Sequence, residues 1–239
     1  MNKEVTILAL DSSAEVSTVA VCKDEKLLSE ITINTGNTHS QTLLPAVEQA
    51  LKMAELTVND IDVFACSTGP GSFTGVRIGV ATIKGIAYGK NKQCVSVSTL
   101  EALAYNLIGF NGIISPVMNA RRSQVYNALF RCDSGILTRI CPDRAISIAE
   151  LDQELSNEKS PVYLCGDGYE ITSSGFKITK TEYVPVRNRY QNAYSVAQIA
   201  LKKVNENGSI NDRELVPIYL RPSQAERERQ ARIDAENIK

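Results

Sequence analysis

The order of predicted strands and helices repeats once along the chain, and this repeat limits the fold more than any other feature of the sequence. Apolar, β-rich runs predict a meander of three strands within residues 5–34. Helical spacing of apolar residues then predicts helices at 40–54, 74–90 and 99–107, with strands at 62–67 and 93–97. From residue 112 the order begins again, with strands at 112–119, 124–131 and 136–140, a helix at 148–155, a strand and glycine turn at 162–168, and a helix at 193–205.

Two consecutive β-β-β-α-β-α units are the organisation of the sugar-kinase/Hsp70/actin fold, in which two lobes face each other across a cleft. We therefore predict a two-lobed α/β fold with an N-terminal lobe at 1–110 and a C-terminal lobe at 111–220. The length of 239 residues suits one large domain or two small ones. Residues 221–239 mix acidic and basic side chains, which predicts a charged tail that is either a solvated helix or disordered.

Charge and hydropathy exclude several classes of protein. The formal net charge is −1, without the basic excess of a chain that binds tRNA or DNA alone, so any nucleic-acid contact needs another subunit. The apolar runs are shorter than the roughly 18 residues of a membrane span, which predicts no membrane insertion. The N-terminus leads directly into a strand and has no signal-peptide core, so we expect a cytoplasmic protein.

Cysteine and histidine usage argues against a metal site. The six cysteines include no C-x-x-C pair, which predicts buried free thiols. His39 is the only histidine, so a metal site built on a histidine pair is excluded, and no nucleophile motif accompanies it for a Ser-His-Asp triad. We expect His39 to cap a helix or to lie on the surface, and Ser40 to be the N-cap of the helix at 40–54.

A glycine-rich loop joins the strand at 62–67 to the next helix. Its glycines permit close backbone approach, and free N–H groups at the helix start attract anions, which favours a phosphate cradle. However, no Gly-Lys-Ser/Thr sequence follows, so the loop is not a P-loop. The loop comprises Gly69, Pro70, Gly71, Ser72, Phe73, Thr74 and Gly75.

The helix that follows the loop contains several glycines, each of which costs about 1 kcal/mol relative to alanine inside a helix. Gly75, Gly79 and Thr82 form a stripe of small residues that allows another helix to approach closely. Two interpretations remain open, namely packing on the helix at 40–54 and a groove for a partner's helix. The second predicts that Gly79→Leu disrupts the complex or dimer while the monomer stays folded.

Two acidic turns are candidates for nucleotide binding. Asp11, Ser12 and Ser13 follow the first strand, and Asp167 lies in a Gly-Asp-Gly turn of the second lobe. In a two-lobed fold both turns are expected to face the cleft, where a carboxylate can hold magnesium-bound water. The alternative is that they only reverse the chain. If Asp11 and Asp167 flank Mg-ATP, the protein is a small-molecule kinase or ATPase of this fold.

Four motifs resemble those of the TsaB family, formerly called YeaZ. They are the segments 7–13, 39–45 and 69–79, together with Asn119-Ala120-Arg121-Arg122, where the family usually has Asp in place of Asn119. The resemblance covers nearly the whole chain and is clearest over residues 5–130. It implies a subunit without catalytic residues, metal or tightly bound cofactor of its own, whose N-terminal lobe binds the partner.

The resemblance also implies partners and a pathway. A TsaD-like subunit, the metal-bearing relative of the same fold, would transfer the threonylcarbamoyl group from threonylcarbamoyl-AMP to N6 of the adenosine next to the anticodon, in tRNAs that read codons starting with A. A TsaE-like ATPase would join them, tRNA would bind only through the complex, and the chain alone could form a homodimer. ATP or ADP with Mg would lie at the complex interface. The expected partner surface comprises Leu43, Leu44, Val47, Gly69, Pro70, Gly71, Ser72, Phe73, Thr74, Gly75, Arg77, Ile78, Gly79, Thr82 and Ile86.

Overall fold

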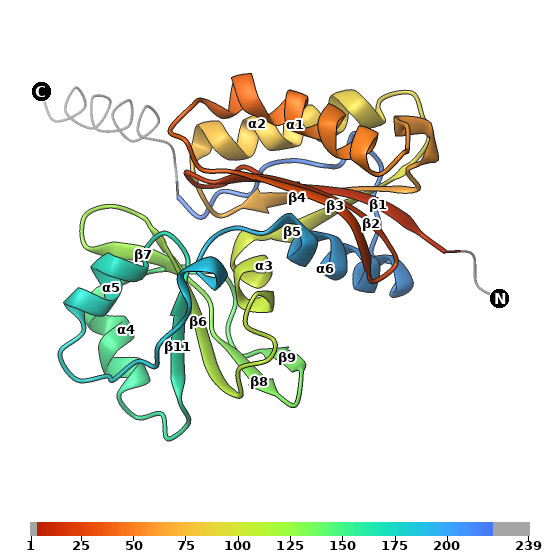
Figure 1. Ribbon diagram of the computed structural model, residues 1–239. Coiled ribbons are helices and arrows are strands. Elements are labelled where there is room, and N and C mark those ends of the chain that lie inside the picture. The colour runs from red at the N-terminus through yellow and green to blue at the C-terminus, as the bar shows by residue number, and fades with distance from the viewer. Residues whose placement is uncertain (1–3, 222–239) are drawn as a thin grey trace, which may run out of the picture.

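The computed structural model describes residues 4–221, and the N-terminal part of the chain forms a five-stranded sheet (Figure 1). Strand β1 pairs antiparallel with β2 and parallel with β4. All six residues of β1 are buried, because this central strand is covered on both faces of the sheet. The sheet has the order β3-β2-β1-β4-β5, with β1 (Thr6–Asp11), β2 (Ser17–Lys23), β3 (Lys26–Ile33), β4 (Val63–Gly69) and β5 (Gln93–Ser98).

Helices cover both faces of this first sheet (Figure 1). Helices α1 (His39–Met53) and α2 (Phe73–Ala87) pack on the face that carries Leu8 and Leu10. Helix α6 (Ala193–Asn205) packs on the opposite face, against Ile7 and Ala9. Because side chains alternate along a strand, the single apolar run of β1 supplies two separate cores.

A second sheet forms around β6 (Gly112–Asn119), which pairs parallel with β11 (Val162–Cys165). The helices that contact its strands are α3 (Thr99–Tyr105), α4 (Ile148–Leu155) and α5 (Tyr169–Gly175). The other strands are β7 (Gln124–Asn127), β8 (Phe130–Asp133), β9 (Ile136–Arg139) and β10 (Arg144–Ser147). Single-turn 3-10 helices lie at Val58–Asp60 and Val186–Asn188. The sequence did not predict β10 or α5 as separate elements.

The predicted strand at 124–131 is interrupted in its middle. β7 and β8 both pair antiparallel with β6, and one register continues from Asn119↔Val125 to Gly112↔Cys132. The gap lies opposite Pro116, which has no N–H for the ladder. There the Asn127 side-chain amide donates instead to the carbonyl oxygens of Pro116 and Ala128, each at 3.1 Å.

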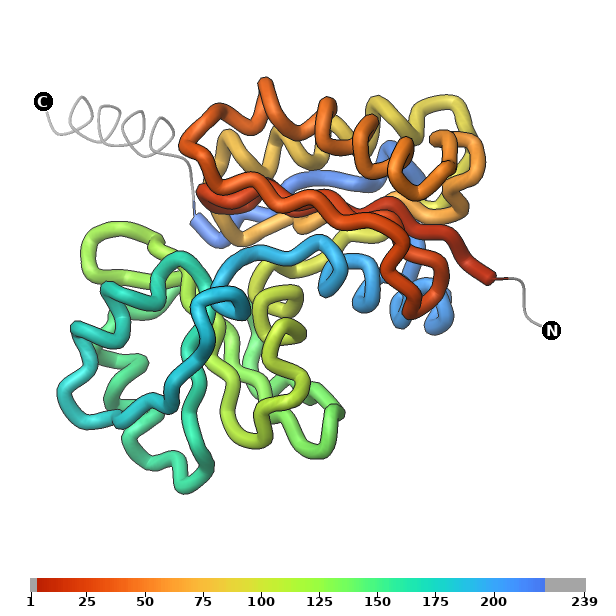
Figure 2. The backbone as a smooth tube through the Cα atoms, in the orientation of Figure 1, coloured from red at the N-terminus to blue at the C-terminus, as the bar shows by residue number. Residues whose placement is uncertain are grey.

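The chain returns to the first sheet after residue 192, as Figure 2 traces. Helix α6 packs on that sheet, Ile210 pairs with Cys94 of the edge strand β5, and Leu215 is buried in the core beneath α1 and α2. This differs from the predicted second lobe at 111–220, because α6 buries its apolar face on the first sheet. The predicted charged tail lies outside the described residues from 222 onward.

Other predictions concern local features and protein class. Thr38, not Ser40, is the N-cap residue of α1, so the predicted cap is wrong by two positions. All six cysteines are free, as predicted, and only Cys141 is not fully buried. Burial raises the pKa of Cys94 to about 11 and that of Cys22 to about 12, which keeps these thiols protonated. Between residues 4 and 221, no helix is both long and apolar enough to cross a bilayer.

Candidate functional site

The glycine-rich loop lies directly against the turn after β1. The backbone N–H of Ser72 donates to the Ser13 carbonyl oxygen at 2.7 Å, and the Ser12 hydroxyl donates to the Gly75 carbonyl oxygen at 2.9 Å. A Cβ added at Gly75 would collide with the carbonyl oxygen of Ser12, and one at Gly79 would lie 2.6 Å from Ser12 Oγ. These glycines are therefore required for a backbone contact inside the lobe.

This contact shows that the small-residue stripe packs inside the lobe, mainly on the first sheet. Gly75 and Gly79 are buried, and they face Ser12 and Leu10 of the first sheet. They do not line a groove at the surface. At Gly75 the helix also approaches the start of α1, since a Cβ there would lie 3.4 Å from His39 Cδ2. The structure therefore argues against the prediction that Gly79→Leu leaves the monomer folded, since the leucine side chain would have to enter the space that Ser12 and Leu10 occupy.

Asp11 is a fully buried carboxylate that joins β1, the following turn and β4. Its Oδ1 accepts hydrogen bonds from the Ser13 N–H at 2.8 Å and the Ser13 hydroxyl at 2.6 Å, and its Oδ2 accepts one from the Ser67 hydroxyl at 2.5 Å. Burial raises the pKa of Asp11, while the hydrogen bonds from Ser13 and Ser67 oppose this rise. With both oxygens occupied, Asp11 acts as an internal tie between strand ends.

His39 is neither the N-cap nor a free surface residue. It is the first residue of α1, and its Nε2 lies 2.6 Å from the Ala14 carbonyl oxygen, so a proton on Nε2 donates to that oxygen. Its Nδ1 is buried without a hydrogen-bond partner among the described residues. The ring thus fastens the start of α1 to the loop between β1 and β2.

A cleft of about 500 Å³ separates the two lobes. On one side it is lined by the loops around Ser13 and Ser72, and on the other by the end of β6 and by Asp167. Asp11 and Ser12 do not belong to this lining. Among the four predicted nucleotide-binding residues, only Ser13 and Asp167 reach the cleft, so the structure does not place the two aspartates around a shared ligand.

Asp167 lies at the second-lobe side of the cleft, partly open to solvent. Desolvation by the surrounding protein raises its pKa to about 6, and the negative charge of Glu15 across the cleft adds to this rise. The backbone N–H of Asn119 donates to Asp167 Oδ1 at 3.3 Å, and this hydrogen bond opposes the rise in pKa. The cleft thus carries the two carboxylates of Glu15 and Asp167 and one cation, Arg121.

Asp167→Asn is expected to stabilise the protein at neutral and alkaline pH. Because the folded pKa is raised from 3.8 to about 6, the folded state binds this proton more tightly than the unfolded state. Tighter proton binding at Asp167 stabilises the folded state. This contribution is fully present below pH 3.8 and is lost as the pH rises through about 6. Thermal unfolding should show a higher Tm for the variant at pH 8, with the difference shrinking toward pH 4. An equal gain at both pH values would contradict this assignment.

An exposed helical face runs along α1 and α2, on the side of the first lobe that is uppermost in Figure 1. On α1, Leu44 is 49% exposed and Met53 is 63% exposed. On α2, Ala81 and Gly85 are exposed and open to solvent, and Tyr88, directly after the helix, is 76% exposed. This α1–α2 face combines large apolar side chains with small residues that permit close approach.

The predicted partner surface therefore divides by burial. Exposed members are Leu44, Ser72, Thr74 and Arg77, and half-buried members are Gly71, Phe73, Ile78, Thr82 and Ile86. Buried members, which cannot touch a partner without rearrangement, are Leu43, Val47, Gly69, Pro70, Gly75 and Gly79. Exposed residues that the predicted set does not contain are Met53 at the end of α1, Ala81 and Gly85 on α2, and Tyr88 directly after α2. The last three recur at spacings of three or four from Arg77 and Ile78, so helical periodicity could have identified them.

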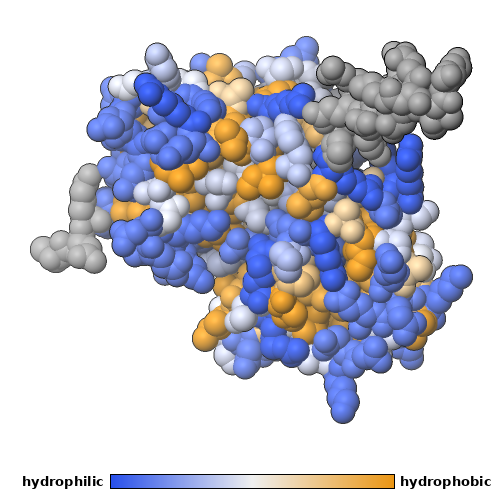
Figure 3. Space-filling view, turned by 180° about the vertical axis from the view of Figure 1, so that it is seen from behind, coloured by the Kyte–Doolittle hydropathy of each residue, from blue (hydrophilic) through white to orange (hydrophobic). Residues whose placement is uncertain are grey.

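Arg77 connects α2 to the returning C-terminal segment. Its Nε donates to the Tyr219 hydroxyl at 2.7 Å, and its guanidinium lies 5.4 Å from the Tyr219 ring centroid. Phe73 stacks on Tyr219 with ring centroids 4.6 Å apart. Figure 3 views the molecule from behind, where apolar patches are interspersed with hydrophilic surface on both lobes. The Phe73–Arg77–Tyr219 stack fixes the start of α2 against residues 218–221.

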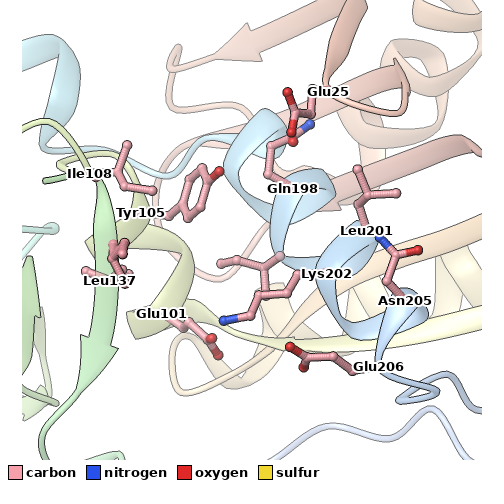
Figure 4. Close-up of a pocket in the computed structure, with 13 residues that line it drawn as sticks. Glu25, Glu101, Tyr105, Ile108, Leu137, Gln198, Leu201, Lys202, Asn205 and Glu206 are labelled. Atoms are coloured by element: carbon pink, nitrogen blue, oxygen red, sulfur yellow. The ribbon is translucent and has the colours of Figure 1, made fainter.

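A further cavity, of about 400 Å³, lies on the opposite side of the lobe junction, between α3, α6 and β9 (Figure 4). Tyr105, Ile108 and Leu137 supply apolar surface, and Lys202 extends toward Glu101. The Glu101 carboxylate already lies 3.5 Å from the Arg139 guanidinium. None of the residues that the sequence predicted for a site lines this cavity.

Comparisons with known proteins agree with the order of elements and with the motifs. The model of the family described as "TsaD: tRNA N6-adenosine threonylcarbamoyltransferase" matches residues 26–226. The tRNA threonylcarbamoyladenosine biosynthesis protein TsaB of Bacillus subtilis (strain 168) is 31% identical over 93% of this chain and 96% of its own length. The protein of that name from Haemophilus influenzae is 28% identical over 92% of this chain and 94% of its own.

Solved structures support the fold. YeaZ from Pseudomonas aeruginosa aligns with a TM-score of 0.74 at 22% identity, over 90% of this chain and 100% of that one. A second Pseudomonas aeruginosa structure, described as an uncharacterized protein with similarity to peptidase YEAZ, aligns with a TM-score of 0.75 over 91% of this chain and 100% of that one. The predicted two-lobed fold of the sugar-kinase/Hsp70/actin type is confirmed.

Proposed function

The chain belongs to the TsaB family, whose curated members are named tRNA threonylcarbamoyladenosine biosynthesis proteins, and from this premise we propose that it is the non-catalytic subunit of a tRNA threonylcarbamoyl transferase. Its role in threonylcarbamoyladenosine biosynthesis follows from the family. Its specific task is to bind and activate a TsaD-like subunit, which transfers the threonylcarbamoyl group from threonylcarbamoyl-AMP to N6 of the adenosine next to the anticodon.

The observation that carries this proposal is the exposed α1–α2 face. Leu44 and Tyr88 present large apolar side chains to solvent, while Ala81 and Gly85 leave room for the backbone of a facing helix. Buried aromatic and aliphatic anchors supply most of the affinity in protein interfaces, and small residues determine how closely helices pack. A helix of the partner is expected to lie across this face.

The burial of the Asp11 carboxylate favours a role as a partner subunit over the alternative, a kinase or an ATPase. A carboxylate that holds Mg-ATP must present a free oxygen to the cleft. Both Asp11 oxygens instead accept hydrogen bonds from Ser13 and Ser67 inside the protein.

Three further assignments belong to the same proposal. A TsaE-like ATPase joins the complex, and ATP or ADP with Mg lies at the complex interface. The α1–α2 face forms a homodimer when the partner is absent.

Ala81→Arg tests the proposed interface. Arginine is a good helix former, so the exposed α2 should tolerate it, whereas a charge buried at an interface without a partner is strongly unfavourable. We expect affinity for the TsaD-like subunit to fall at least about 30-fold, corresponding to about 2 kcal/mol. Titration of the two purified subunits measures the affinity, and nucleoside analysis of tRNA from the reconstituted reaction measures activity.

Gln153→Arg is the matched control, since it places the same side chain at an exposed position of α4 in the second lobe. It should leave both affinity and modification unchanged. If Ala81→Arg binds the TsaD-like subunit as tightly as the wild type, the interface lies elsewhere on the molecule. If the isolated chain modifies tRNA or turns over ATP without partners, the non-catalytic assignment is wrong.

A further inference from the structure

A groove on the second lobe has a basic rim and an apolar floor. It lies between the turn that joins β6 to β7 and the helices α4 and α5, and it encloses about 710 Å³. Ile148, Ala149 and Ile171 provide apolar surface along the groove. Its charged lining residues are all cations, namely Arg121, Arg122 and Lys177. The proposed interface on α1 and α2 belongs to the other lobe, so this groove is separate from it.

The three cations are available to a ligand. All three are exposed, and within residues 4–221 none of their side chains has an ion-pair or hydrogen-bond partner. Other arginines of this lobe are engaged, for example Arg144 with Glu154 at 2.7 Å and Arg189 with Glu170 at 3.1 Å. The groove therefore gathers three cations that the described part of the protein leaves without a partner.

Two nearby carboxylates, Glu150 and Asp152, are held by other groups, whereas Asp167 lies in the adjacent cleft between the lobes, which Arg121 also lines. Glu150 accepts hydrogen bonds from the N–H and the hydroxyl of Ser147 at 3.1 and 2.6 Å, in the capping box of α4. Asp152 is buried and accepts the backbone N–H groups of Lys177, Ile178 and Thr179. These contacts fix the loop that carries Lys177 and direct both carboxylates to backbone donors.

The turn that presents the arginines has an unusual backbone. Arg121, Arg122 and Ser123 are three consecutive residues with positive φ, at 64°, 53° and 56°. Each such non-glycine residue costs about 1–2 kcal/mol. The other non-glycine residues with positive φ, Asp24, Glu55, Asn91, Ser134 and Asn207, occur singly. The Asn119 side chain stabilises the turn by accepting the Arg121 N–H at 2.8 Å. Two adjacent arginines are thus held at the edge of one groove.

We propose that this groove binds the sugar-phosphate backbone of the tRNA that the assembled complex modifies. The inference rests on the proposed function. Arginine pairs with phosphate oxygens through its planar fork, lysine adds a point charge, and an apolar floor accommodates a ribose or base. Three cations are too few to bind tRNA alone, which agrees with the net charge of −1 and with tRNA binding only through the complex.

The test uses the complex of this chain with its TsaD-like subunit and measures tRNA affinity by fluorescence anisotropy at several salt concentrations. The double variant Arg121→Ala/Arg122→Ala should bind tRNA about tenfold more weakly, with a salt dependence reduced by about two units of slope. Lys177→Ala lies outside the strained turn, and it should reduce the slope by about one unit even if the double variant folds poorly.

The double variant Lys26→Ala/Lys159→Ala removes the same charge from exposed positions elsewhere and should leave affinity and slope unchanged. Wild-type affinity and slope in both groove variants would overturn the inference. Weaker subunit binding by the groove variants, with wild-type tRNA affinity and slope in the complex that still forms, would also overturn it and would assign the groove to an acidic protein segment. The proposed function fails separately, if the wild-type chain neither assembles with the TsaD-like subunit nor supports tRNA modification.

Discussion

Gly79→Leu is expected to unfold the protein or to leave it barely stable. A Cβ at this position would lie 2.6 Å from Ser12 Oγ and 3.1 Å from Leu10 Cδ1, and a leucine adds three more carbon atoms on the same side. Ser12 and Leu10 are fully or almost fully buried, and the Ser12 hydroxyl is hydrogen-bonded to Gly75, so neither can move aside at low cost. Overpacking in a core typically costs about 1–3 kcal/mol, and we expect the upper end or more here.

The same substitution at Gly85 provides the control, because a Cβ there meets no atom within 4 Å. Glycine is about 0.8–1.0 kcal/mol less favourable than alanine in a helix, and leucine ranks just below alanine, so Gly85→Leu should unfold at an equal or higher urea concentration than the wild type. Urea unfolding followed by circular dichroism compares the two variants. Gly85→Leu is nevertheless expected to weaken the complex, since the bulky side chain lies on the α1–α2 face. Equal stability of the two variants would show that Gly79 is not closely packed.

Asp11→Ala is expected to lower the free energy of unfolding by about 3 kcal/mol, since several hydrogen bonds to a charged acceptor are lost and two buried hydroxyls remain unpaired. The affected donors are the N–H and hydroxyl of Ser13 and the hydroxyl of Ser67. Part of the loss is offset, because the variant no longer buries a carboxylate whose pKa is raised by desolvation. Urea unfolding at pH 7 measures the difference.

Asp11→Asn separates the hydrogen bonds from the charge. Its Oδ1 can still accept from Ser13, and its amide can donate to the Ser67 hydroxyl, so the loss should be clearly smaller than for alanine. Because the folded pKa of Asp11 is raised, the wild type loses stability as the pH rises through that pKa, and the asparagine variant does not. The free energy of unfolding that Asp11→Asn loses relative to the wild type should therefore be smaller at pH 8 than at pH 4. Equal losses for alanine and asparagine would argue against the hydrogen-bond network.

The sequence was sufficient to predict most of the architecture. Two periodicities, of two residues in strands and of about three and a half in helices, are local properties, and they placed nearly every element of both lobes. The predicted helix at 40–54 became α1 at His39–Met53, and the predicted helix at 74–90 became α2 at Phe73–Ala87. The motifs likewise identified the family, because they depend on residue identity and spacing alone.

The orientation of α2 could not be predicted in the same way. Its sequence places Gly75, Gly79, Ala81 and Gly85 around the helix, so small residues occur on its buried and its exposed side. Periodicity identifies which residues share a side, but it does not identify the element that a side contacts. Only the structure shows that Gly75 and Gly79 face Ser12, and that Ala81 and Gly85 are exposed.

What the sequence by itself determined is the repeated order of elements, the free thiols and the family. What only the tertiary structure decided is how distant segments meet. The Ser67 hydroxyl reaches Asp11 across 56 positions of the chain and the Ser12 hydroxyl reaches Gly75 across 63, while α6 returns from the second half to cover the first sheet. Such contacts arise because apolar faces from different parts of the chain must be buried against each other, and buried polar groups must find partners wherever the fold supplies them.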